Sequence, residues 1–281
     1  MSASVDPFLR WAGSKRQLGA TLRRYAPLGD YRYVEPFCGS ASLFFALRPT
    51  RALLADINPG VIGTFEAVKS SPDAVHAALQ EWAVTETQYY HVRSLPDASL
   101  DVAGRAARMI YLMRYCYGGI YRTNANGRFN VPYGGGRTGV LPTLDQLRST
   151  SLSLENTTLV AGDFEEVLDR EAQKGDFVYL DPPYASSTAR KSLQYGPASF
   201  AVGDLERAAG LLERLNARGC SFVLSYSDTP EAVETFSRWP VERVCVRRLV
   251  AANADRRVQA QELIVSNRRS FLHREEPAEC A

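Results

Sequence analysis

The segment GDFVYLDPPYAS, residues 175–186, joins an apolar run directly to side chains that could do chemistry. Phe177–Leu180 is short, apolar and rich in aromatic and β-branched residues, which predicts a buried strand. The two prolines that follow cannot donate to a sheet ladder, so the strand must end there. Asp181 is therefore left at the carboxyl end of a strand, on a stiff turn, with Tyr184 close behind it.

These side chains suit methyl transfer to an amino nitrogen better than hydrolysis. Asp181 can accept one hydrogen of an exocyclic amine, and the Pro182 carbonyl, whose direction is fixed by the locked φ of proline, can accept the other. Tyr184 can stack on a planar base. Accepting both protons favours a localised lone pair on the nitrogen, which can then attack an activated methyl group. The alternative interpretation is a proline-rich turn with an incidental tyrosine.

The surrounding sequence alternates strands and helices, as in a doubly wound parallel sheet. A strand is expected at Tyr31–Val34, followed by a turn containing Gly39 and an apolar helix. A second strand ends in Asp56, and a helix follows over about residues 60–69. The same rhythm returns near residue 157 and continues to the last two strands, with a polar loop at residues 251–261 between them.

Between these two parts the rhythm breaks. Helical patterns dominate from about residue 70 to 114, and a segment rich in Gly, Asn, Arg and Tyr follows. In that segment, NANG at residues 124–127 separates two short extended runs, which predicts a β-hairpin. We therefore expect a catalytic domain in two parts, residues 1–60 and 151–281, and an inserted domain at residues 61–150.

Three acids lie at or just after predicted strand ends: Asp56, Asp163 and Asp181. Ligands of open α/β sheets bind outside the carboxyl ends of the strands, and an acid after the second strand can accept two ribose hydroxyls. Together the acids favour a ligand that carries a nucleoside, although each alone could be a helix cap. The segment WAGSK lacks the glycine spacing of a phosphate-binding loop, so a nucleoside triphosphatase is not expected.

Composition excludes several other classes. The chain has 281 residues, 45% of them hydrophobic, with a net charge of +2 and a pI of about 8.2. This balance excludes a uniformly basic coat but not a local basic face. The five cysteines include no C-x-x-C pair, so no zinc or dithiol site is predicted. No apolar run could span a bilayer and no leader pattern is present, so we expect no membrane association and a cytoplasmic location.

Beyond these patterns, the chain resembles the Dam-type DNA adenine-N6 methyltransferases of the D12 class. FLRWAGSK, VEPFCGSASLFF, LADINP, NGRFNVPYG, GDF and DFVYLDPPY are all present, and the resemblance covers roughly residues 8–268. It implies a Rossmann-like methyltransferase sheet with an inserted, mostly helical target-recognition domain that carries a β-hairpin. It also implies S-adenosylmethionine as methyl donor, no metal, and transfer to N6 of an adenine flipped out of duplex DNA, within GATC.

The resemblance assigns residues to three roles. The catalytic residues would be Asp181, Pro182, Pro183 and Tyr184. The cofactor would be bound by Trp11, Lys15, Phe37, Gly39, Asp56, Asp163, Phe164 and Asp181. DNA would be contacted by Arg10, Arg114, Tyr117, Ile120, Arg122, Asn126, Arg128 and Pro132.

The chain departs from the family pattern at two positions. Gly118 stands where the family often has asparagine, so Tyr117 would have to fill more of the gap left by the flipped base. Arg10 stands where lysine is common, which keeps the charge and adds bidentate recognition of guanine.

Two other activities stay open: N4-cytosine methylation, for which SPPY is the more usual motif, and DNA binding without catalysis. Asp181 argues against the first of these, as it does against glutamine methylation, which usually has NPPY. C5-cytosine chemistry is not expected because the chain has no Pro-Cys dipeptide. The resemblance further implies a monomer that acts on double-stranded DNA in a cytoplasm of bacterial or phage type, either alone or beside a restriction endonuclease as part of a restriction-modification system.

Overall fold

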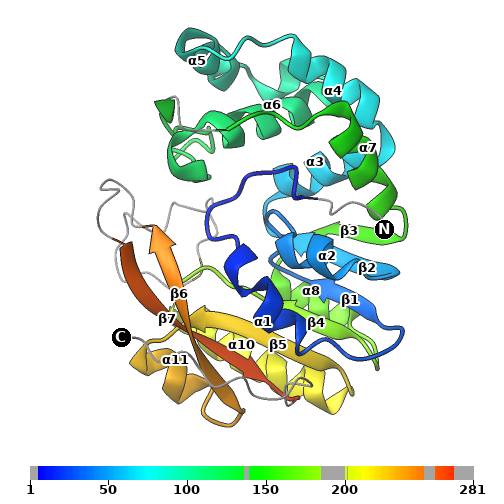
Figure 1. Ribbon diagram of the computed structural model, residues 1–281, viewed down its shortest axis with the longest axis vertical. Helices are drawn as coiled ribbons and strands as arrows, with labels where there is room; N and C mark the ends of the chain where they lie inside the picture. The colour runs from blue at the N-terminus through cyan, green and yellow to red at the C-terminus, as the bar shows by residue number, and fades with distance from the viewer. Residues whose placement is uncertain (1–5, 136–138, 185–199, 201, 250–256, 269–281) are drawn as a thin grey trace.

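The computed structural model describes residues 6–135, 139–184, 200, 202–249 and 257–268 (Figure 1). Within them the strands form one seven-stranded sheet in the order β3-β2-β1-β4-β5-β7-β6. The strands are β1 (Arg32–Glu35), β2 (Arg51–Asp56), β3 (Thr157–Ala161), β4 (Phe177–Leu180), β5 (Ser221–Ser227), β6 (Val241–Leu249) and β7 (Arg257–Ser266).

The described helices fall into two groups. Those of the sheet domain are α1 (Gly19–Arg23), α2 (Ser42–Leu47), α3 (Pro59–Ser70), α8 (Phe164–Glu171), α10 (Val202–Ala217) and α11 (Pro230–Thr235). Those of the upper layer in Figure 1 are α4 (Pro72–Gln80), α5 (Glu86–Ser94), α6 (Val102–Tyr115) and α7 (Leu144–Ser153).

The first five strands are parallel, and their central members are buried on both faces. β1 pairs with β2 and β4, and β4 pairs with β5, all in parallel register. β7 runs antiparallel to both β5 and β6. Successive residues of β4 point to opposite sides: Phe177 and Tyr179 join one core, whereas Val178 and Leu180 join the other. The predicted doubly wound sheet is thus confirmed.

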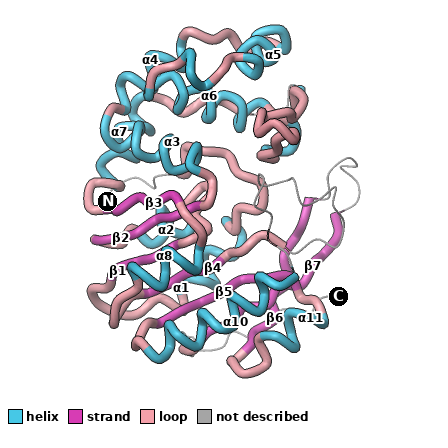
Figure 2. Tube along the Cα trace, turned by 180° about the vertical axis from the view of Figure 1, so that it is seen from behind, coloured by secondary structure: helices cyan, strands magenta, loops and turns pink. Residues whose placement is uncertain are grey.

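Each face of the sheet has its own helical cover (Figures 1 and 2). α8, α10 and α11 bury apolar residues such as Leu168, Leu211 and Ala232 against one face. α1, α2 and α3 cover the other face with residues such as Leu22 and Phe44. The chain between β1 and α2 therefore crosses the carboxyl edge of the sheet, where the ends of the parallel strands are open.

Helix α3 joins the sheet domain to the helical layer. It packs against β2 and β3 on one side and against α4, α6 and α7 on the other. Phe65 belongs to the same buried cluster as Ile110 of α6 and Leu147 of α7. The inserted domain of residues 61–150 remains a prediction, and its apolar core is continuous with one face of the sheet.

Two local predictions need adjustment. The segment around NANG turns back antiparallel through the isolated bridges Thr123–Phe129 and Cys116–Tyr133, without regular strands. The loop expected at residues 251–261 is wrong in its last part, because β7 already begins at Arg257 and pairs there with Leu249. Residues 257–261 of β7 pair with β6 alone, because the register between β5 and β7 covers only residues 262–266. Residues 251–256 lie outside the described part of the chain.

Candidate active site

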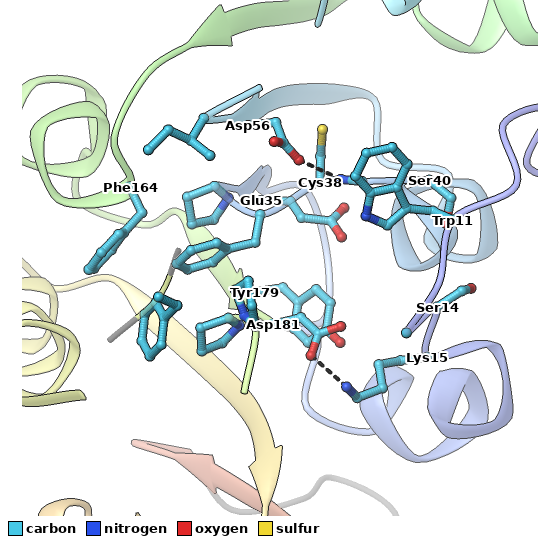
Figure 3. A pocket seen from close by; sticks show the side chains of 18 of the residues that line it. Trp11, Ser14, Lys15, Glu35, Cys38, Ser40, Asp56, Phe164, Tyr179 and Asp181 are labelled. Carbon is cyan, nitrogen blue, oxygen red and sulfur yellow. Dashed lines mark hydrogen bonds and ion pairs between the residues drawn. The ribbon is translucent and has the colours of Figure 1, made fainter. Parts of the chain in front are cut away.

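A pocket opens at the carboxyl ends of β1, β2 and β4 (Figure 3). Every residue predicted for catalysis or for the cofactor contributes to its wall, including Asp181 to Tyr184. The other predicted wall residues are Trp11, Lys15, Phe37, Gly39, Asp56, Asp163 and Phe164. Segments far apart in sequence therefore meet where the sheet topology leaves room for a ligand.

Asp181 is held by one of its two oxygens. Oδ1 accepts hydrogen bonds from Lys15 Nζ at 2.8 Å and from Ser225 Oγ at 3.0 Å. Within the described residues Oδ2 makes no hydrogen bond, so it is available to a ligand. Burial raises the pKa of Asp181, and the Lys15 ammonium opposes this shift by attracting the charged form. Lys15 therefore favours the carboxylate, which is the form that can accept a proton from an amine.

Behind Asp181, a buried hydrogen-bond chain fixes its orientation. Ser225 Oγ lies 3.0 Å from the Tyr179 hydroxyl, and both residues are buried in neighbouring strands. Because Ser225 donates to the carboxylate, its oxygen accepts the proton of Tyr179. Sequence reasoning missed Ser225, since the strand SFVLSYS carries no sign that one of its serines meets Asp181.

Lys15 contacts Tyr184 as well as Asp181. Its Nζ donates to the Tyr184 hydroxyl at 3.0 Å. Burial alone lowers the pKa of Lys15, but Asp181, Tyr184 and Glu262 together raise it above the ordinary value. The side chain is therefore a cation at neutral pH. It links the predicted catalytic acid to the predicted stacking ring.

Asp56 is a buried carboxylate that backbone donors position. Its Oδ2 accepts the Gly39 N–H at 3.0 Å, and its Oδ1 accepts the Asn58 N–H at 2.9 Å. Each oxygen keeps lone-pair capacity for a second donor. Burial raises the pKa of Asp56 to about 6, against the effect of the two backbone donors. This arrangement suits a ligand with two adjacent hydroxyl groups.

Gly39 lets an indole ring close over the pocket. A Cβ atom at this position would lie 2.7 Å from Cδ1 of Trp11, and the glycine has a φ of +46°. Both facts exclude a larger residue without rearrangement. On its other side, Trp11 stacks on Tyr121 with ring centroids 5.6 Å apart. Trp11 thus joins the pocket to the segment that carries the predicted hairpin.

Asp163 and Phe164 form the opposite end of the pocket. Asp163 caps α8 through its Oδ1, which accepts the Glu165 N–H at 3.0 Å and an Arg207 hydrogen bond at 2.6 Å. The Phe164 ring packs on Phe37 with centroids 5.0 Å apart and lies 4.7 Å from the Arg207 guanidinium carbon. Arg207 was not predicted, and its helical context gives no signal for it.

Glu35 is a further acid in the pocket wall and was also missed. It ends β1 within VEPF, is 3% exposed, and accepts the Tyr33 hydroxyl at 2.9 Å. Burial raises the pKa of Glu35 well above its ordinary value, and the charges of Asp181 and Asp56 add to this shift. The signal that could have found it is the position of an acid at the end of a strand.

The predicted DNA-binding residues lie outside this pocket. Tyr117, Asn126, Arg128 and Pro132 are exposed, and Ile120 is half-buried. Their common segment is tied to the pocket by the Ala12 N–H, which donates to the Gly119 carbonyl at 3.0 Å.

Arg10 and Arg114 are engaged with the backbone. Arg10 donates to the Arg114 carbonyl at 3.0 Å, and Arg114 donates to the Phe8 carbonyl at 3.4 Å. Both are partly buried, and the DNA contacts assigned to them remain predictions.

The left-handed backbone explains the paired glycines of this segment. Gly118 and Gly119 both have a φ of +66°. A Cβ at Gly119 would lie 2.9 Å from Nε of Arg10, whereas at Gly118 it would lie 3.2 Å from the end of the Ile120 side chain. Asparagine tolerates this conformation, so the family's usual residue would fit the Gly118 backbone with a small movement of Ile120.

Two further searches cover the described residues only. In that part of the chain no group of three or more His, Cys, Asp or Glu side chains could hold a metal ion. None of the helices described there is both long and apolar enough to cross a membrane.

Sheet topology and pocket together define a Rossmann-like α/β protein with a ligand site at the carboxyl ends of its parallel strands. The chain belongs to the D12 class N6 adenine-specific DNA methyltransferase family, whose profile matches residues 11–250. It is 33% identical to the DNA adenine methylase of Escherichia coli strain K12 over 262 residues, which cover 92% of this chain and 93% of the relative. It is 31% identical over 273 residues to the type II methyltransferase M1.LlaDCHI of Lactococcus lactis subsp. cremoris, with 94% and 96% covered.

Proposed function

We propose that this protein transfers a methyl group from S-adenosylmethionine to N6 of an adenine that has been flipped out of duplex DNA. The proposal rests on the way in which the two carboxylate oxygens of Asp181 are held. One oxygen is held by Lys15 and Ser225, while the other is available at the pocket wall beside Tyr184. A carboxylate oriented in this way can receive the amino group of a base that has left its duplex partner.

In this proposal the protein contributes orientation and charge. Asp181 Oδ2 accepts one N6 hydrogen, the Pro182 carbonyl accepts the other, and Pro183 stiffens the turn. Tyr184 stacks on the base. S-adenosylmethionine supplies a methyl group on a sulfonium. The N6 lone pair would form the new C–N bond as the C–S bond breaks, the electron pair would remain on sulfur, and N6 would pass one proton to the Asp181 carboxylate. Alignment of the two reactants provides much of the rate.

The pocket residues fit such a cofactor. Asp56 presents two carboxylate oxygens for the ribose hydroxyls. Phe37 and Phe164 offer aromatic surface to the adenine ring, and the Asp163 oxygen that does not bind Arg207 can accept from its amine. Trp11 and Gly39 narrow the space between these two ends.

We further propose GATC as the DNA site, read by the segment from Tyr117 to Pro132. Its support is family membership together with exposed cationic and aromatic side chains such as Arg128 and Tyr117. Action as a monomer in a bacterial or phage-type cytoplasm, and a companion restriction endonuclease, belong to the same proposal. One of the relatives is named as a type II methyltransferase.

The test is expression in a host without DNA methylation, followed by sequencing that detects modified bases. The proposal expects N6-methyladenine in GATC and none in cells that express Asp181→Ala. N4-methylcytosine would identify the alternative activity, and unmodified DNA with retained DNA binding would identify an inactive relative. N6-methyladenine in another sequence would overturn only the GATC part.

A further inference from the structure

Glu262 is a buried acid beside the pocket that neither the motifs nor the proposed mechanism uses. It lies on β7, opposite Ser227 of β5 and Val244 of β6, and it is 2% exposed. A carboxylate in such a place is costly unless partners compensate for its lost hydration. Its partners therefore show what it does.

Those partners belong to the predicted active site. The Tyr184 hydroxyl donates to Glu262 Oε1 at 2.6 Å, and Lys15 Nζ lies 3.7 Å from Oε2. Lys15 also donates to the same hydroxyl at 3.0 Å. An ammonium can only donate, so the tyrosine oxygen accepts from Lys15 and directs its own proton to Glu262.

A second contact holds the Tyr184 ring itself. The ring meets Tyr226 of β5 edge-on, with centroids 5.4 Å apart and an interplanar angle of 80°. A tyrosine side chain has two main torsions, and anchoring both its hydroxyl and its ring leaves little freedom in either. Tyr184 is nevertheless 36% exposed, so part of its surface remains open to a ligand.

We propose that Glu262 is a positioning residue that acts through the Tyr184 hydroxyl and holds the ring ready to stack on the flipped adenine. This inference rests on the proposed function. The same unit includes Lys15, which bridges the hydroxyl and Asp181, so the stacking ring and the catalytic acid are aligned together. A platform fixed before DNA arrives does not have to be ordered during the reaction.

The test compares Glu262→Ala, Tyr184→Phe and the double variant in methyl transfer to a duplex that carries the target site. Each single variant should lower kcat by roughly 10- to 100-fold, the scale expected when a reacting group is misplaced by about 1 Å. KM for S-adenosylmethionine should stay unchanged. The double variant should be no slower than the slower single variant, because both changes remove the same hydrogen bond.

Conservative and control variants separate positioning from folding. Glu262→Gln keeps an acceptor for the hydroxyl, so it should restore most of the kcat lost in Glu262→Ala. The matched control is Glu242 on β6, which accepts a hydrogen bond from the Tyr25 hydroxyl away from the pocket. Glu242→Ala should leave kcat within about twofold of the unmodified protein, as is usual for substitutions away from the site.

Fluorescence of 2-aminopurine at the target position reads the stacking directly. Relative to the unmodified protein, Glu262→Ala and Tyr184→Phe should change the 2-aminopurine fluorescence of the flipped base in the same direction and by a similar amount. The inference is overturned if Tyr184→Phe, which leaves β7 intact, transfers methyl groups at the unmodified rate, or if the losses of the two single variants multiply in the double variant. If the unmodified protein does not methylate adenine at all, the proposed function has failed instead.

Discussion

At the scale of single residues, Asp181 combines two features that usually conflict. It is buried enough for its pKa to rise, yet Lys15 and Ser225 donate hydrogen bonds that favour the charged form. A carboxylate prepared in this way is charged and oriented to accept a hydrogen bond from an amine. The proposed mechanism depends on the charge and the direction of this one group.

Asp181→Ala should therefore lower methyl transfer by about 10²-fold or more, which is the cost of removing one positioned acceptor from an enclosed site. Ser225→Ala should cost about tenfold, since it removes one hydrogen bond to a charged group. Single-turnover transfer measures both losses, and DNA binding by gel shift should be retained. Near-normal turnover of Asp181→Ala would contradict the mechanism.

The raised pKa of Asp56 predicts how cofactor binding depends on pH. Its pKa, raised to about 6 by burial, means that the carboxylate gains a proton as pH falls through that value. Protonation removes acceptor capacity for the ribose hydroxyls, so S-adenosylmethionine should bind about tenfold more weakly at pH 5 than at pH 7. Calorimetry measures this change.

Asp56→Asn is the control for that titration. The variant should bind the cofactor weakly at both pH values, by roughly 1–3 kcal/mol relative to the unmodified protein at pH 7. An equally steep pH dependence in Asp56→Asn would assign the titration to another group. Unchanged affinity in the variant would remove Asp56 from the cofactor site.

At the scale of elements, the segment between α6 and α7 presents Arg122 in a defined orientation. Its Nε donates to Asn130 Oδ1 at 2.8 Å, and within the described residues its two terminal nitrogens make no hydrogen bond. A guanidinium anchored at Nε keeps those nitrogens available for the O6 and N7 atoms of a guanine. Arg128 differs, because it is exposed at the turn and, in the part of the chain that the structure describes, its side chain makes no such contact.

Arg122→Ala should therefore narrow the difference in methylation rate between the preferred site and a site altered at one base pair, by about 1–3 kcal/mol at that pair. Arg128→Ala is the matched control and should weaken all sites alike while reducing the salt slope by about one unit. Rates on the preferred site and its single-pair variants, at two salt concentrations, distinguish the two. A uniform loss in Arg122→Ala would make it a phosphate contact.

At the scale of the whole molecule, the helical layer and the sheet share one apolar core. Val61 and Phe65 of α3 belong to the same cluster as Tyr33 of β1 and Ile110 of α6. This shared burial couples the helical layer to the sheet domain. If one of them unfolded, the other would lose the contacts that it makes through α3. The protein should consequently unfold as one unit.

Denaturant unfolding should give coincident transitions from probes in the two parts. Trp82 packs on Tyr111 in the helical layer, and Trp239 packs on Phe222 of the sheet domain. Two double variants each keep a single tryptophan. Trp11→Phe with Trp239→Phe keeps Trp82, and Trp11→Phe with Trp82→Phe keeps Trp239. Midpoints that agree after correction for the stability of each variant would confirm the coupling, and two separated transitions would contradict it.

The sequence alone determined those parts of the site that are local. Asp181 had to end a strand because two prolines follow an apolar run, and Asp56 had to lie at the same sheet edge because parallel strands place their carboxyl ends together. The alternation of strands and helices predicted the sheet in the same way. These features depend on neighbours in the chain, so their pattern is visible in the sequence.

The tertiary structure decided which distant side chains meet these acids. Ser225 and Glu262 belong to strands. The alternation of side chains along a strand predicts which face of the sheet a residue lies on, but not which residue it contacts there. Arg207 belongs to an ordinary amphipathic helix. Only the order of the strands brings β5 and β7 beside the end of β4 and sets Ser225 against Asp181 and Glu262 against Tyr184. Pairing of this kind follows from burial and sheet register across the whole chain, and no local pattern records it.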